Sequence, residues 1–406
     1  VCDECQISGS KKLESIIFLG YHPPVNNYYE IGSKAEEQPS YPCELFFCEE
    51  SKLLQLGVTV NQEILFPSSY PYTSSTTKIL RDNFANLYNE TTKLFSLDEN
   101  DLIVDIGSND GNLLSNFMHK HKVLGVTPED IGNLAIQKGI PTIIDYFGEK
   151  VASQILNENG KAKIITATNV FAHIDNPNLI TKLIEGLLDD DGAFISESHY
   201  LIPLLDTLQY DTIYHEHLRY YSLTSLKYLL EKNGLRPFKA QKIPTHGGSI
   251  RVFACKSDSS IETDKSITEI LAEEKEYLNL KSLHKFRDNV VKSKLALISL
   301  LKEINEDGKT IVGISAPSRA STLINYVGLD SDIIDCIFEI KGSYKIGKYV
   351  PGTRIPVLDE KILYEKQPDY ALIFSWHIAD DSIANLRKNG FNGKFIIPLP
   401  EPKIVQ

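Results

Sequence analysis

The segment from Val104 to Gly111 reads Val-Asp-Ile-Gly-Ser-Asn-Asp-Gly and has the strongest chemical signature in the chain. An apolar run ends in an acid, Asp105, and two glycines follow before a helix-like stretch at 112–117. Glycines directly after a strand let the backbone approach a ligand closely, and the start of a helix favours negative charge. The spacing differs from both the dinucleotide fingerprint and the phosphate-binding loop.

This pattern suits S-adenosylmethionine, with Asp105 near its sulfonium and amino groups and the glycines beneath its amino acid moiety. The simpler alternative is a glycine turn of any α/β protein. In such folds an acid at the end of the next strand usually holds the ribose diol. Here the strand at 123–126 is followed by Thr127, whose hydroxyl cannot make the paired charged hydrogen bonds of a carboxylate. Either Glu129 or Asp130 reaches the ribose instead, or the cofactor binds more weakly.

The segment 211–217, Asp-Thr-Ile-Tyr-His-Glu-His, ends in four consecutive side chains that can handle protons. It predicts a catalytic cluster in which His217 is a general base that Tyr214 and Glu216 tune and orient. Alternatively, His215 and His217 chelate a metal, because residues two apart in an extended segment share one face. No third ligand is obvious, which counts against a metal. A solvated polar loop is the remaining interpretation.

The segment 245–251, Thr-His-Gly-Gly-Ser-Ile-Arg, leads into a predicted strand. Its glycine pair permits close backbone approach, so His246 and Arg251 could face a phosphate or a sugar. An ordinary turn before a strand is the simpler interpretation of this segment taken alone.

Four of the six cysteines, Cys2, Cys5, Cys43 and Cys48, fall within the first 48 residues. Cys2-x-x-Cys5 is one half of a zinc knuckle. Cys43 and Cys48 are five positions apart and would lie on opposite faces of a regular strand, so the second half is irregular. Because a small module with little apolar material usually needs a staple, the cysteines predict a metal site within residues 1–72.

Two alternating patterns predict the elements that position these groups. From 73 to 255, short β-branched runs alternate with helix-like stretches, which indicates βαβ units and a mainly parallel sheet. The strands of this part are expected at 102–106, 123–126, 164–167, 193–196 and 250–254. A second alternation predicts strands at 310–313, 333–339, 370–374 and 394–398, with a turn into a helix over 316–326.

Between the two alternations, apolar residues recur every three or four positions from 262 to 305. This spacing predicts one or two long amphipathic helices, which end at Asp307-Gly308. The predicted fold class is therefore α/β. Its four parts are an N-terminal cysteine-containing module (1–72), a central domain (73–255), a helical connector (256–308) and a smaller C-terminal α/β domain (309–406).

The 406 residues carry 42 Lys and Arg against 54 Asp and Glu, a net charge of −12. This balance argues against a protein that binds nucleic acid through its phosphates, although a few local cations suffice for an anionic small molecule. No apolar run approaches the ~20 residues of a membrane span, and the acidic start of the sequence does not look like a secretory signal. Since six cysteines are too few for a disulfide framework, we expect a cytoplasmic protein.

Taken together and in order, the motifs resemble those of the deoxysugar C-methyltransferases that act on nucleotide-linked 4-keto-6-deoxysugars. The resemblance covers nearly the whole chain, and the combination is far more specific than any single motif. It rests on Cys2-x-x-Cys5, Leu19-Gly20 with Asn26, Cys48 followed by Leu54-Gln55-Leu56, Tyr-Pro-Tyr-Thr-Ser-Ser at 70–75, the turn at 105–111, Asp-Tyr-Phe-Gly at 145–148, Asn169 with His173, Tyr214-x-Glu216-His217, His246-Gly247-Gly248, and the segments 313–325 and 351–356.

The resemblance implies an N-terminal zinc-binding-type module, a central Rossmann-like domain for S-adenosylmethionine, and a C-terminal Rossmann-like domain that helps to enclose the nucleotide sugar. It also implies that a base removes the proton beside the ketone and that the resulting enolate attacks the sulfonium methyl. Such a base contributes ~10²–10⁴-fold in rate. The implied catalytic residues are His217 as the base, Tyr214, Glu216, Tyr72 and His173.

The resemblance assigns the remaining roles as follows. Cofactor binding falls to Asp105, Gly107, Ser108, Asn109, Gly111, Thr127, Asp145 and Asn169. Substrate binding falls to His246, Arg251, Arg319 and Lys345. Zinc binding falls to Cys2, Cys5 and Cys48.

The chain departs from the family pattern at three functional positions. Ser51 stands where the fourth zinc-binding cysteine is expected, Thr127 where the ribose-binding acid is expected, and Arg319 where Lys is usual. Two other functions use the same residues. One is a relative that enolises the keto sugar for epimerisation without methyl transfer, and the other is a non-catalytic protein that binds cofactor or sugar. A dinucleotide oxidoreductase is disfavoured because neither first strand is followed by the G-x-G-x-x-G fingerprint.

Overall fold

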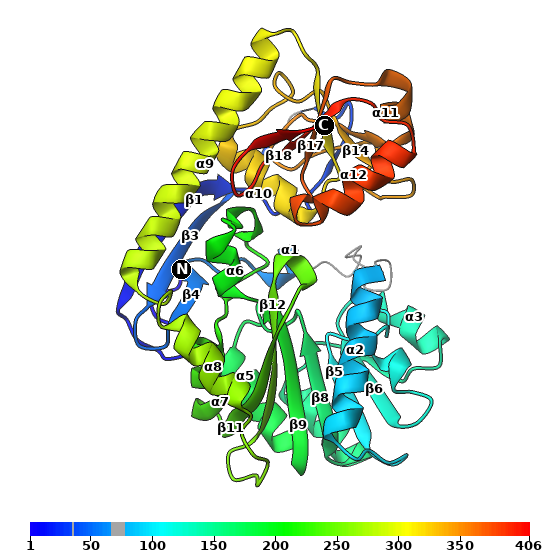
Figure 1. Cartoon of the computed structure of the whole chain (residues 1–406). Helices are drawn as coiled ribbons and strands as arrows, with labels where there is room; N and C mark the ends of the chain where they lie inside the picture. Colours follow the sequence, from blue (N-terminus) through cyan, green and yellow to red (C-terminus); the bar gives the residue numbers. More distant parts are fainter. Residues whose placement is uncertain (35, 66–77) are drawn as a thin grey trace.

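The fold is built on three larger β-sheets that follow one another along the chain (Figure 1). The structure is a computed structural model that describes residues 1–34, 36–65 and 78–406. The α/β class predicted from the sequence is confirmed, because the central and C-terminal sheets are mainly parallel and are connected through helices.

The N-terminal module is an antiparallel sheet in the order β1-β3-β4-β10. Its own strands are β1 (Leu13–His22), β3 (Tyr41–Cys48) and β4 (Leu53–Leu56). The fourth strand, β10 (Arg219–Tyr220), comes from the central part of the chain and pairs with β4. The module therefore completes its sheet with a segment that begins directly after the predicted catalytic cluster.

The central domain has a seven-stranded sheet in the order β11-β12-β9-β8-β5-β6-β7. The last five strands in this order run parallel, and β11 and β12 form an antiparallel edge. All five residues of β5 are buried, as expected for a parallel strand that is covered on both faces. The strands are β5 (Leu102–Ile106), β6 (Lys122–Thr127), β7 (Thr142–Ile144), β8 (Ala162–Thr168), β9 (Leu188–His199), β11 (Leu235–Ile243) and β12 (Ser249–Lys256).

One expected helix of the central domain is absent. Residues 112–117 form turns around a short 3₁₀ helix, η2 (Leu114–Asn116). The side chains of Ser115 and Asn116 donate to the backbone carbonyl of Asn112, which competes with regular helix hydrogen bonds. The helices and 3₁₀ turns up to residue 247 are α1 (Gln62–Leu65), α2 (Lys78–Leu94), α3 (Gly132–Gln137), α4 (Glu149–Asn159), α5 (Pro177–Leu187), α6 (Leu201–Asp206), η3 (Tyr210–Thr212), α7 (Leu223–Lys232) and η4 (Thr245–Gly247).

Two helices connect the central and C-terminal domains and confirm the amphipathic pattern. They are α8 (Lys265–Glu274) and α9 (Leu280–Glu306), and α9 ends at Asp307-Gly308 as predicted. Figure 1 shows α9 as the long helix along one side of the molecule, reaching from the central domain to the C-terminal domain. Phe286, Val290, Leu301 and Ile304 of the predicted stripe are buried, together with Leu283 and Leu297. Val291, Leu295 and Ile298, which were expected in the same stripe, are exposed.

The C-terminal domain has a six-stranded sheet in the order β16-β14-β13-β17-β18-β19. The strand expected at 333–339 is shortened to Ile337–Glu339, because the amides of Ile333 and Ile334 donate to the Asp330 carbonyl in a turn. A two-stranded ribbon of β2 and β15 joins this domain to the N-terminal module. The remaining elements are β2 (Tyr29–Glu30), β13 (Ile311–Ile314), α10 (Ser318–Val327), β14 (Ile337–Glu339), β15 (Lys348–Tyr349), β16 (Val357–Asp359), α11 (Lys361–Lys366), β17 (Tyr370–Ile373), η5 (Trp376–Ile378), α12 (Ala379–Lys388), β18 (Lys394–Ile397) and β19 (Lys403–Val405).

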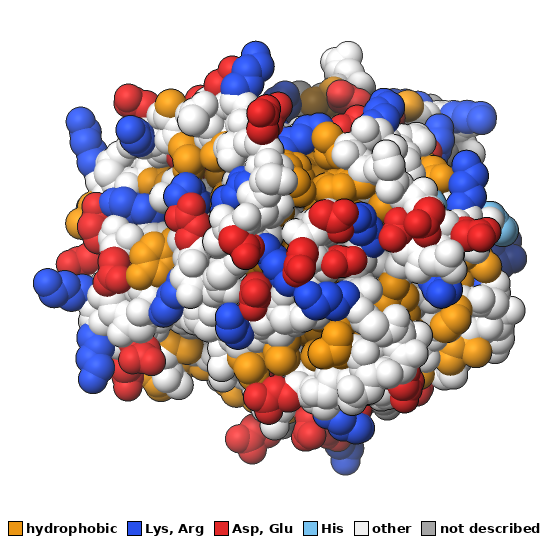
Figure 2. Space-filling model, turned by 90° about the horizontal axis from the view of Figure 1, so that it is seen from below, with side chains coloured by type: hydrophobic (Ala, Val, Ile, Leu, Met, Phe, Trp, Pro, Cys, Tyr) orange, Lys and Arg blue, Asp and Glu red, His pale blue; other side chains and the backbone are white. Residues whose placement is uncertain are grey.

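The surface carries charges of both signs. Figure 2 shows one face, on which acidic and basic side chains are interspersed rather than gathered by sign. On that face, this is unlike the basic stripe of a protein that binds nucleic acid. Within the described ranges, none of the helices is long and apolar enough to span a bilayer.

Candidate active site

A cavity of about 800 Å³ lies between the central and C-terminal domains. Its walls come from the turn after β5, from the segment that follows η3 and from the start of α10. Most of the residues predicted from the sequence meet here, although they are far apart along the chain. They are Asp105, Gly107, Ser108, Asn109, Asn169, His173, Tyr214, Glu216, His217, His246, Arg319 and Lys345.

The turn after β5 forms a backbone cradle in this cavity. Gly107 has a φ of +76°, and a Cβ there would come within 2.3 Å of the Val170 side chain. The amides of Gly107 and Ser108 donate to the Val126 carbonyl of β6 at 2.8 and 3.0 Å, which fixes the turn against the next strand. The Ser108 hydroxyl is buried beside the cavity and, within the described part of the chain, has no hydrogen-bond partner. Such an orphaned group is expected where a ligand completes the site.

Asp105 presents a buried carboxyl group to the same cavity. Its Oδ1 atom accepts a hydrogen bond from the Thr166 hydroxyl at 2.6 Å. Burial raises the pKa of Asp105 to about 7, against the Thr166 hydrogen bond and with help from the Glu197 carboxylate. A nearby cation favours the ionised form of such a group. Together with the cradle and the orphaned hydroxyl, Asp105 fits the cationic amino acid end of S-adenosylmethionine.

His217 has a defined tautomer in this site. Its Nδ1 atom lies 3.0 Å from the Thr212 carbonyl, and since a carbonyl oxygen only accepts, Nδ1 carries the proton. The Nε2 atom therefore holds the lone pair, and the Tyr214 hydroxyl donates to it at 3.2 Å. Burial, followed by the neighbouring His173 and His199, lowers the pKa of His217 well below its usual value. A neutral imidazole that lines the cavity in this way can act as a general base.

The His173 ring packs beside His217, and Glu216 links this wall of the cavity to other parts of the chain. The ring centroids of His173 and His217 are 5.2 Å apart, and His173 Nδ1 donates to the Glu216 carbonyl. The Glu216 carboxylate accepts a hydrogen bond from Asn26 of the N-terminal module at 2.8 Å. Asn26 in turn accepts one from the Tyr344 hydroxyl of the C-terminal domain at 3.1 Å. All three parts of the molecule therefore meet at this wall.

Arg319 is already paired within the protein. Its Nε and Nη2 atoms donate to the two carboxylate oxygens of Asp211 at 2.8 and 3.0 Å. Trp376 Nε1 donates to the same carboxylate at 2.7 Å. Arg319 Nη1 donates to His377 Nδ1 at 2.7 Å, because a guanidinium group cannot accept. Arginine in place of the expected lysine thus forms a fixed fork, which a single ammonium group could not form.

Lys345 provides the second predicted cation of the cavity. Its ammonium group donates to the Ala316 carbonyl and lies 5.5 and 5.6 Å from the ring centroids of Tyr28 and Tyr344. Burial lowers the pKa of Lys345, and the Glu339 and Glu216 carboxylates oppose that shift. A lysine held beside a cavity in this way can contact an anionic group of a ligand.

Two cavity histidines, His199 and His377, were missed by the sequence analysis. They line the cavity with His246, which was predicted. Burial, with the Arg319 charge, lowers the pKa of His199 and His377 to about 3 and that of His246 to about 4. All three rings are therefore neutral near pH 7. His199 ends β9 and His377 follows β17, so the carboxyl ends of parallel strands were the signal that could have found them.

Arg251 is placed in the core rather than at the cavity. It is fully buried in β12, and its Nε atom donates to the Glu197 carboxylate at 2.6 Å. Its remaining donors bond to the side chains of Asn83 and Asn86 on α2. The expectation that Arg251 contacts a phosphate or a sugar is therefore corrected, since its charge is paired inside the central domain.

Three predicted cofactor residues also lie off the cavity wall. Gly111 has a φ of +76° and packs against α3. Asp145 forms an ion pair with Lys150 at 2.8 Å, whereas the residues that follow it, 146–148, line the cavity. Thr127 is buried at the end of β6. Tyr72 and the whole motif at 70–75 lie outside the described residues.

Two of the three predicted zinc ligands, Cys5 and Cys48, lie side by side, and the third lies apart. Cys5 Sγ lies 3.1 Å from the Ser51 hydroxyl, and Cys48 Sγ lies 3.5 Å from the Ser8 hydroxyl. We call these four residues the thiol–hydroxyl cluster. Cys2 lies apart, since its Sγ atom contacts the hydroxyl of Thr59 and the amide of Gln6, each at 3.4 Å.

The side chains of the module do not fit a zinc ion. Throughout the described residues, no group of three His, Cys, Asp or Glu is arranged to hold a metal. A structural zinc site needs four ligands in tetrahedral geometry, and the cluster offers two thiols and two hydroxyls. The alternative chelate also fails, because His215 faces the Pro42 carbonyl at 3.3 Å whereas His217 faces that of Thr212.

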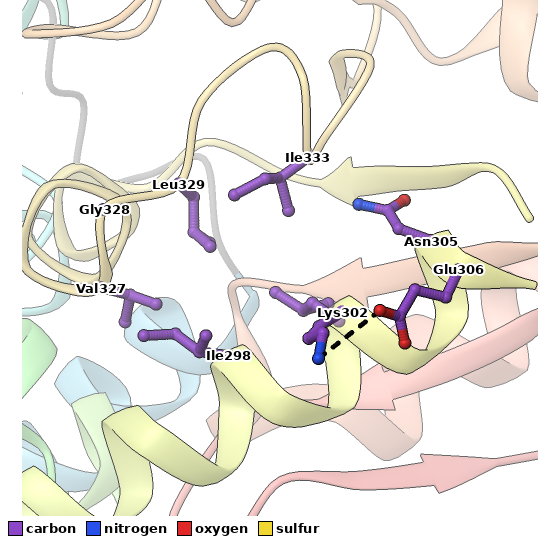
Figure 3. Close-up of a pocket in the computed structure, with 9 residues that line it drawn as sticks. Ile298, Lys302, Asn305, Glu306, Val327, Gly328, Leu329 and Ile333 are labelled. Atoms are coloured by element: carbon purple, nitrogen blue, oxygen red, sulfur yellow. Dashed lines mark ion pairs between the residues drawn. The ribbon is translucent and has the colours of Figure 1, made fainter. Parts of the chain in front are cut away.

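A second hollow, of about 450 Å³, lies between α9 and the segment after α10 (Figure 3). It is lined mainly by apolar side chains, including Ile298, Val327 and Ile333, and the Lys302–Glu306 ion pair borders it at 3.5 Å. None of the predicted site residues lines this hollow, so it is separate from the candidate active site.

Family models match three consecutive parts of the chain. They are a zinc-binding-type domain at 5–66, a methyltransferase domain at 79–239 and a C-methyltransferase C-terminal domain at 244–400. The C-methyltransferase NovU of Streptomyces niveus is 31% identical over 410 residues, which cover 99% of this chain and 97% of that protein.

Two solved structures illustrate the match, and each covers less than half of this chain. A protein of Pyrococcus horikoshii OT3 is 16% identical with a TM-score of 0.38, and covers 49% of this chain and 100% of its own. The magnesium protoporphyrin IX methyltransferase ChlM of Synechocystis PCC 6803, with bound SAH, is 14% identical with a TM-score of 0.34. That match covers 44% of this chain and 83% of ChlM.

Proposed function

The chain belongs to the C-methyltransferase family, and on this premise we propose that it methylates a carbon next to the ketone of a nucleotide-linked 4-keto-deoxysugar, with S-adenosylmethionine as the donor. The observation that carries the proposal is a single cavity lined by both the glycine turn after β5 and the His217 imidazole. A carbon can be deprotonated and methylated in one active site only if a base and a methyl donor share that space.

S-adenosylmethionine, when bound, supplies an electrophilic methyl group. Asp105 would hold its cationic end, and the turn at 107–109 would lie beneath its amino acid moiety. Asn169, whose φ of +57° is unusual for a residue other than glycine, follows β8 on the neighbouring strand and lines the same cavity. Burial of Asp105 strengthens its attraction for a cation, because charges interact more strongly in a low dielectric.

His217 acts as the base. Its Nε2 lone pair takes the proton from the carbon beside the ketone, and the electrons of the broken C–H bond form the enolate. The Thr212 carbonyl holds the Nδ1 proton, which keeps the ring oriented and stabilises the imidazolium that forms. The Tyr214 hydroxyl, 3.2 Å from Nε2, is close enough to donate to the enolate oxygen instead. The enolate carbon would then form a bond to the methyl group that S-adenosylmethionine supplies, and the electrons of the broken S–CH3 bond would remain on sulfur as the neutral thioether S-adenosylhomocysteine.

Lys345 and Arg319 form the side of the cavity that suits the diphosphate of the nucleotide. Because both carboxylate oxygens of Asp211 already bind Arg319, we expect Lys345 to make the stronger contact with phosphate oxygens. His246 lies on the same cavity wall and can donate a hydrogen bond to a sugar hydroxyl.

Proton exchange in deuterated water tests the role of His217. The purified protein, given nucleotide 4-keto sugars without a methyl donor, should exchange the C–H beside the ketone. His217→Gln should slow this exchange by ~10²–10⁴-fold. His119→Gln, at an exposed histidine, serves as the matched control.

Adding S-adenosylmethionine should then increase the mass of the sugar by one methylene unit. Unchanged exchange in His217→Gln would contradict the assigned base. Rapid exchange by the wild-type protein with no mass increase would point instead to epimerisation.

A further inference from the structure

We propose that Glu129, two residues beyond the end of β6, binds the ribose hydroxyls of S-adenosylmethionine. The inference rests on the proposed function. It concerns the contact with the ribose hydroxyls, for which the sequence has no acid at the usual position. The residue that ends β6 is Thr127, and a hydroxyl there cannot make the two hydrogen bonds of a carboxylate.

The side chain of Thr127 does not reach the cavity and so does not contact a ligand there directly. Thr127 is 1% exposed and does not line the cavity. Its methyl group packs against the start of α3, where a Cβ on Gly132 would come within 2.6 Å of it. Its hydroxyl donates to Glu129 Oε2. The threonine therefore acts on a ligand only through Glu129, and is a positioning residue.

Glu129 is placed where a ribose would need it. It lines the cavity together with Pro128, the turn at 107–109 and Tyr146. Burial raises the pKa of Tyr146, and the Glu129 charge adds to this shift, as expected for two neighbouring side chains. Each carboxylate oxygen can accept about two hydrogen bonds, so the bond from Thr127 leaves room for both hydroxyls of a diol.

Asp130, the other candidate in the sequence, does not meet these conditions. It is exposed and is not part of the cavity wall. Its carbonyl accepts hydrogen bonds from the backbone and side chain of Asn133 at the beginning of α3, which ties this position to the helix. The chain therefore offers a matched pair, one acid at the cavity and one beside it.

Calorimetric titration with two probes tests the proposal. The probes are S-adenosylhomocysteine and its 2′,3′-dideoxyribose analogue, and the proteins are the wild type, Glu129→Gln, Glu129→Ala and Asp130→Asn. A hydrogen bond to a charged group corresponds to about 10- to 100-fold in Kd. We expect Glu129→Ala to weaken binding of S-adenosylhomocysteine by that factor and binding of the dideoxy analogue by less than about twofold. Asp130→Asn should bind both probes like the wild type.

The outcomes separate this inference from the function on which it rests. If the wild type binds S-adenosylhomocysteine and both Glu129 variants bind it equally well, the assignment of Glu129 is overturned and the methyltransferase proposal stands. An equal loss for both probes would also overturn it, since the effect would not involve the ribose. If the wild type binds neither S-adenosylmethionine nor S-adenosylhomocysteine, the proposed function falls and the inference falls with it.

Discussion

The N-terminal module and the central domain each lack one polar residue of the pattern that the chain resembles, and the two regions differ in what replaces it. In the module, Ser51 occupies the position where a cysteine is expected, and hydrogen bonds between thiols and hydroxyls hold the thiol–hydroxyl cluster together. In the central domain, Thr127 stands for an acid, and its hydroxyl donates to the carboxylate of Glu129 beside the cavity.

The difference follows from what each ligand requires. A structural zinc ion needs four donors at fixed distances and angles, so one missing thiolate cannot be replaced by a group elsewhere. A ribose diol needs only a carboxylate within hydrogen-bond reach, and a neighbouring position in a turn can provide it. A lost residue is therefore easier to replace when its ligand needs one charged group than when its ligand needs four donors in tetrahedral geometry.

The largest effect should come from the buried charge pair of the central domain. Arg251→Gln leaves the fully buried Glu197 carboxylate without its cation, and we expect the free energy of unfolding to fall by ~3–5 kcal/mol. Ser8→Ala in the thiol–hydroxyl cluster should cost only ~1–2 kcal/mol, because it removes two hydrogen bonds of an uncharged hydroxyl, one to Cys48 Sγ and one from the Ser10 amide. Urea unfolding measures both. Equal losses of unfolding free energy in Arg251→Gln and Ser8→Ala would contradict the expected difference between the buried ion pair and the thiol–hydroxyl cluster.

Restoring the missing cysteine should create a metal site. Ser51 Oγ lies 3.1 Å from Cys5 Sγ, and Cys48 is a hydrogen-bonded neighbour of both, so Ser51→Cys brings three thiols together. Water can take the fourth position on the zinc ion. We expect the wild type to hold well under one zinc per chain and Ser51→Cys to hold about one, with a Tm higher by a few degrees. Elemental analysis and thermal melts with and without a chelator measure this. Full zinc occupancy in the wild type would contradict the interpretation that its thiol–hydroxyl cluster does not bind zinc.

The pH dependence of cofactor binding should report the buried acid of the central domain. The pKa of Asp105 is raised to about 7, so its carboxylate forms as the pH rises through that value. Binding of cationic S-adenosylmethionine should therefore strengthen up to about tenfold between pH 6 and pH 8. Asp105→Asn should bind weakly and lose this dependence. A flat profile in the wild type would show that Asp105 does not face the cation.

The raised pKa of Asp105 has the opposite effect on the free energy of unfolding, which should fall as the pH rises. The unfolded chain ionises Asp105 near its ordinary value of 3.8, whereas the folded protein keeps the proton until about pH 7. The contribution of this group to the stability is therefore present in full at low pH and is lost as the pH rises between these values. Asp105→Asn should remove that part of the pH dependence of unfolding.

The smallest effect should come from Thr127→Val. This change removes the hydrogen bond that orients Glu129 but leaves the carboxylate in place, so S-adenosylhomocysteine should bind about 2- to 10-fold more weakly. Thr127→Ser keeps the hydroxyl and should bind like the wild type. Both are read by calorimetry against the dideoxy analogue. A loss as large as that of Glu129→Ala would make Thr127 itself the ribose ligand.

Local sequence patterns were sufficient to predict much of the fold and the glycine turn of the candidate site. β5 and β6 were predicted because continuous apolar runs define buried parallel strands, and α9 because its apolar spacing persists for many turns. The turn after β5 was placed at a ligand site because two glycines follow an apolar strand there and let the backbone approach a ligand closely. Each of these inferences uses only residues that are close along the chain.

Contacts between distant residues could not be predicted in the same way. Arg251 was mistaken for a ligand contact because its partner, Glu197, lies 54 positions away on the adjacent strand. Nothing local indicates that Asn26 contacts Glu216 across 190 positions. The convergence of cysteines was overestimated for the related reason that spacing along the chain does not fix where side chains meet across strands.

The short strand β10 has a consequence for how the enzyme can evolve. Arg219 and Tyr220 pair with Gln55 and Leu54, and the Leu218 carbonyl accepts from Leu56, so the loop that bears His217 is anchored by the N-terminal sheet. Any lineage that discarded the module would also lose the contacts that hold the loop of His217 in the cavity wall. The module can therefore keep a structural role without a bound ion, because its strand pairing fixes the position of one imidazole.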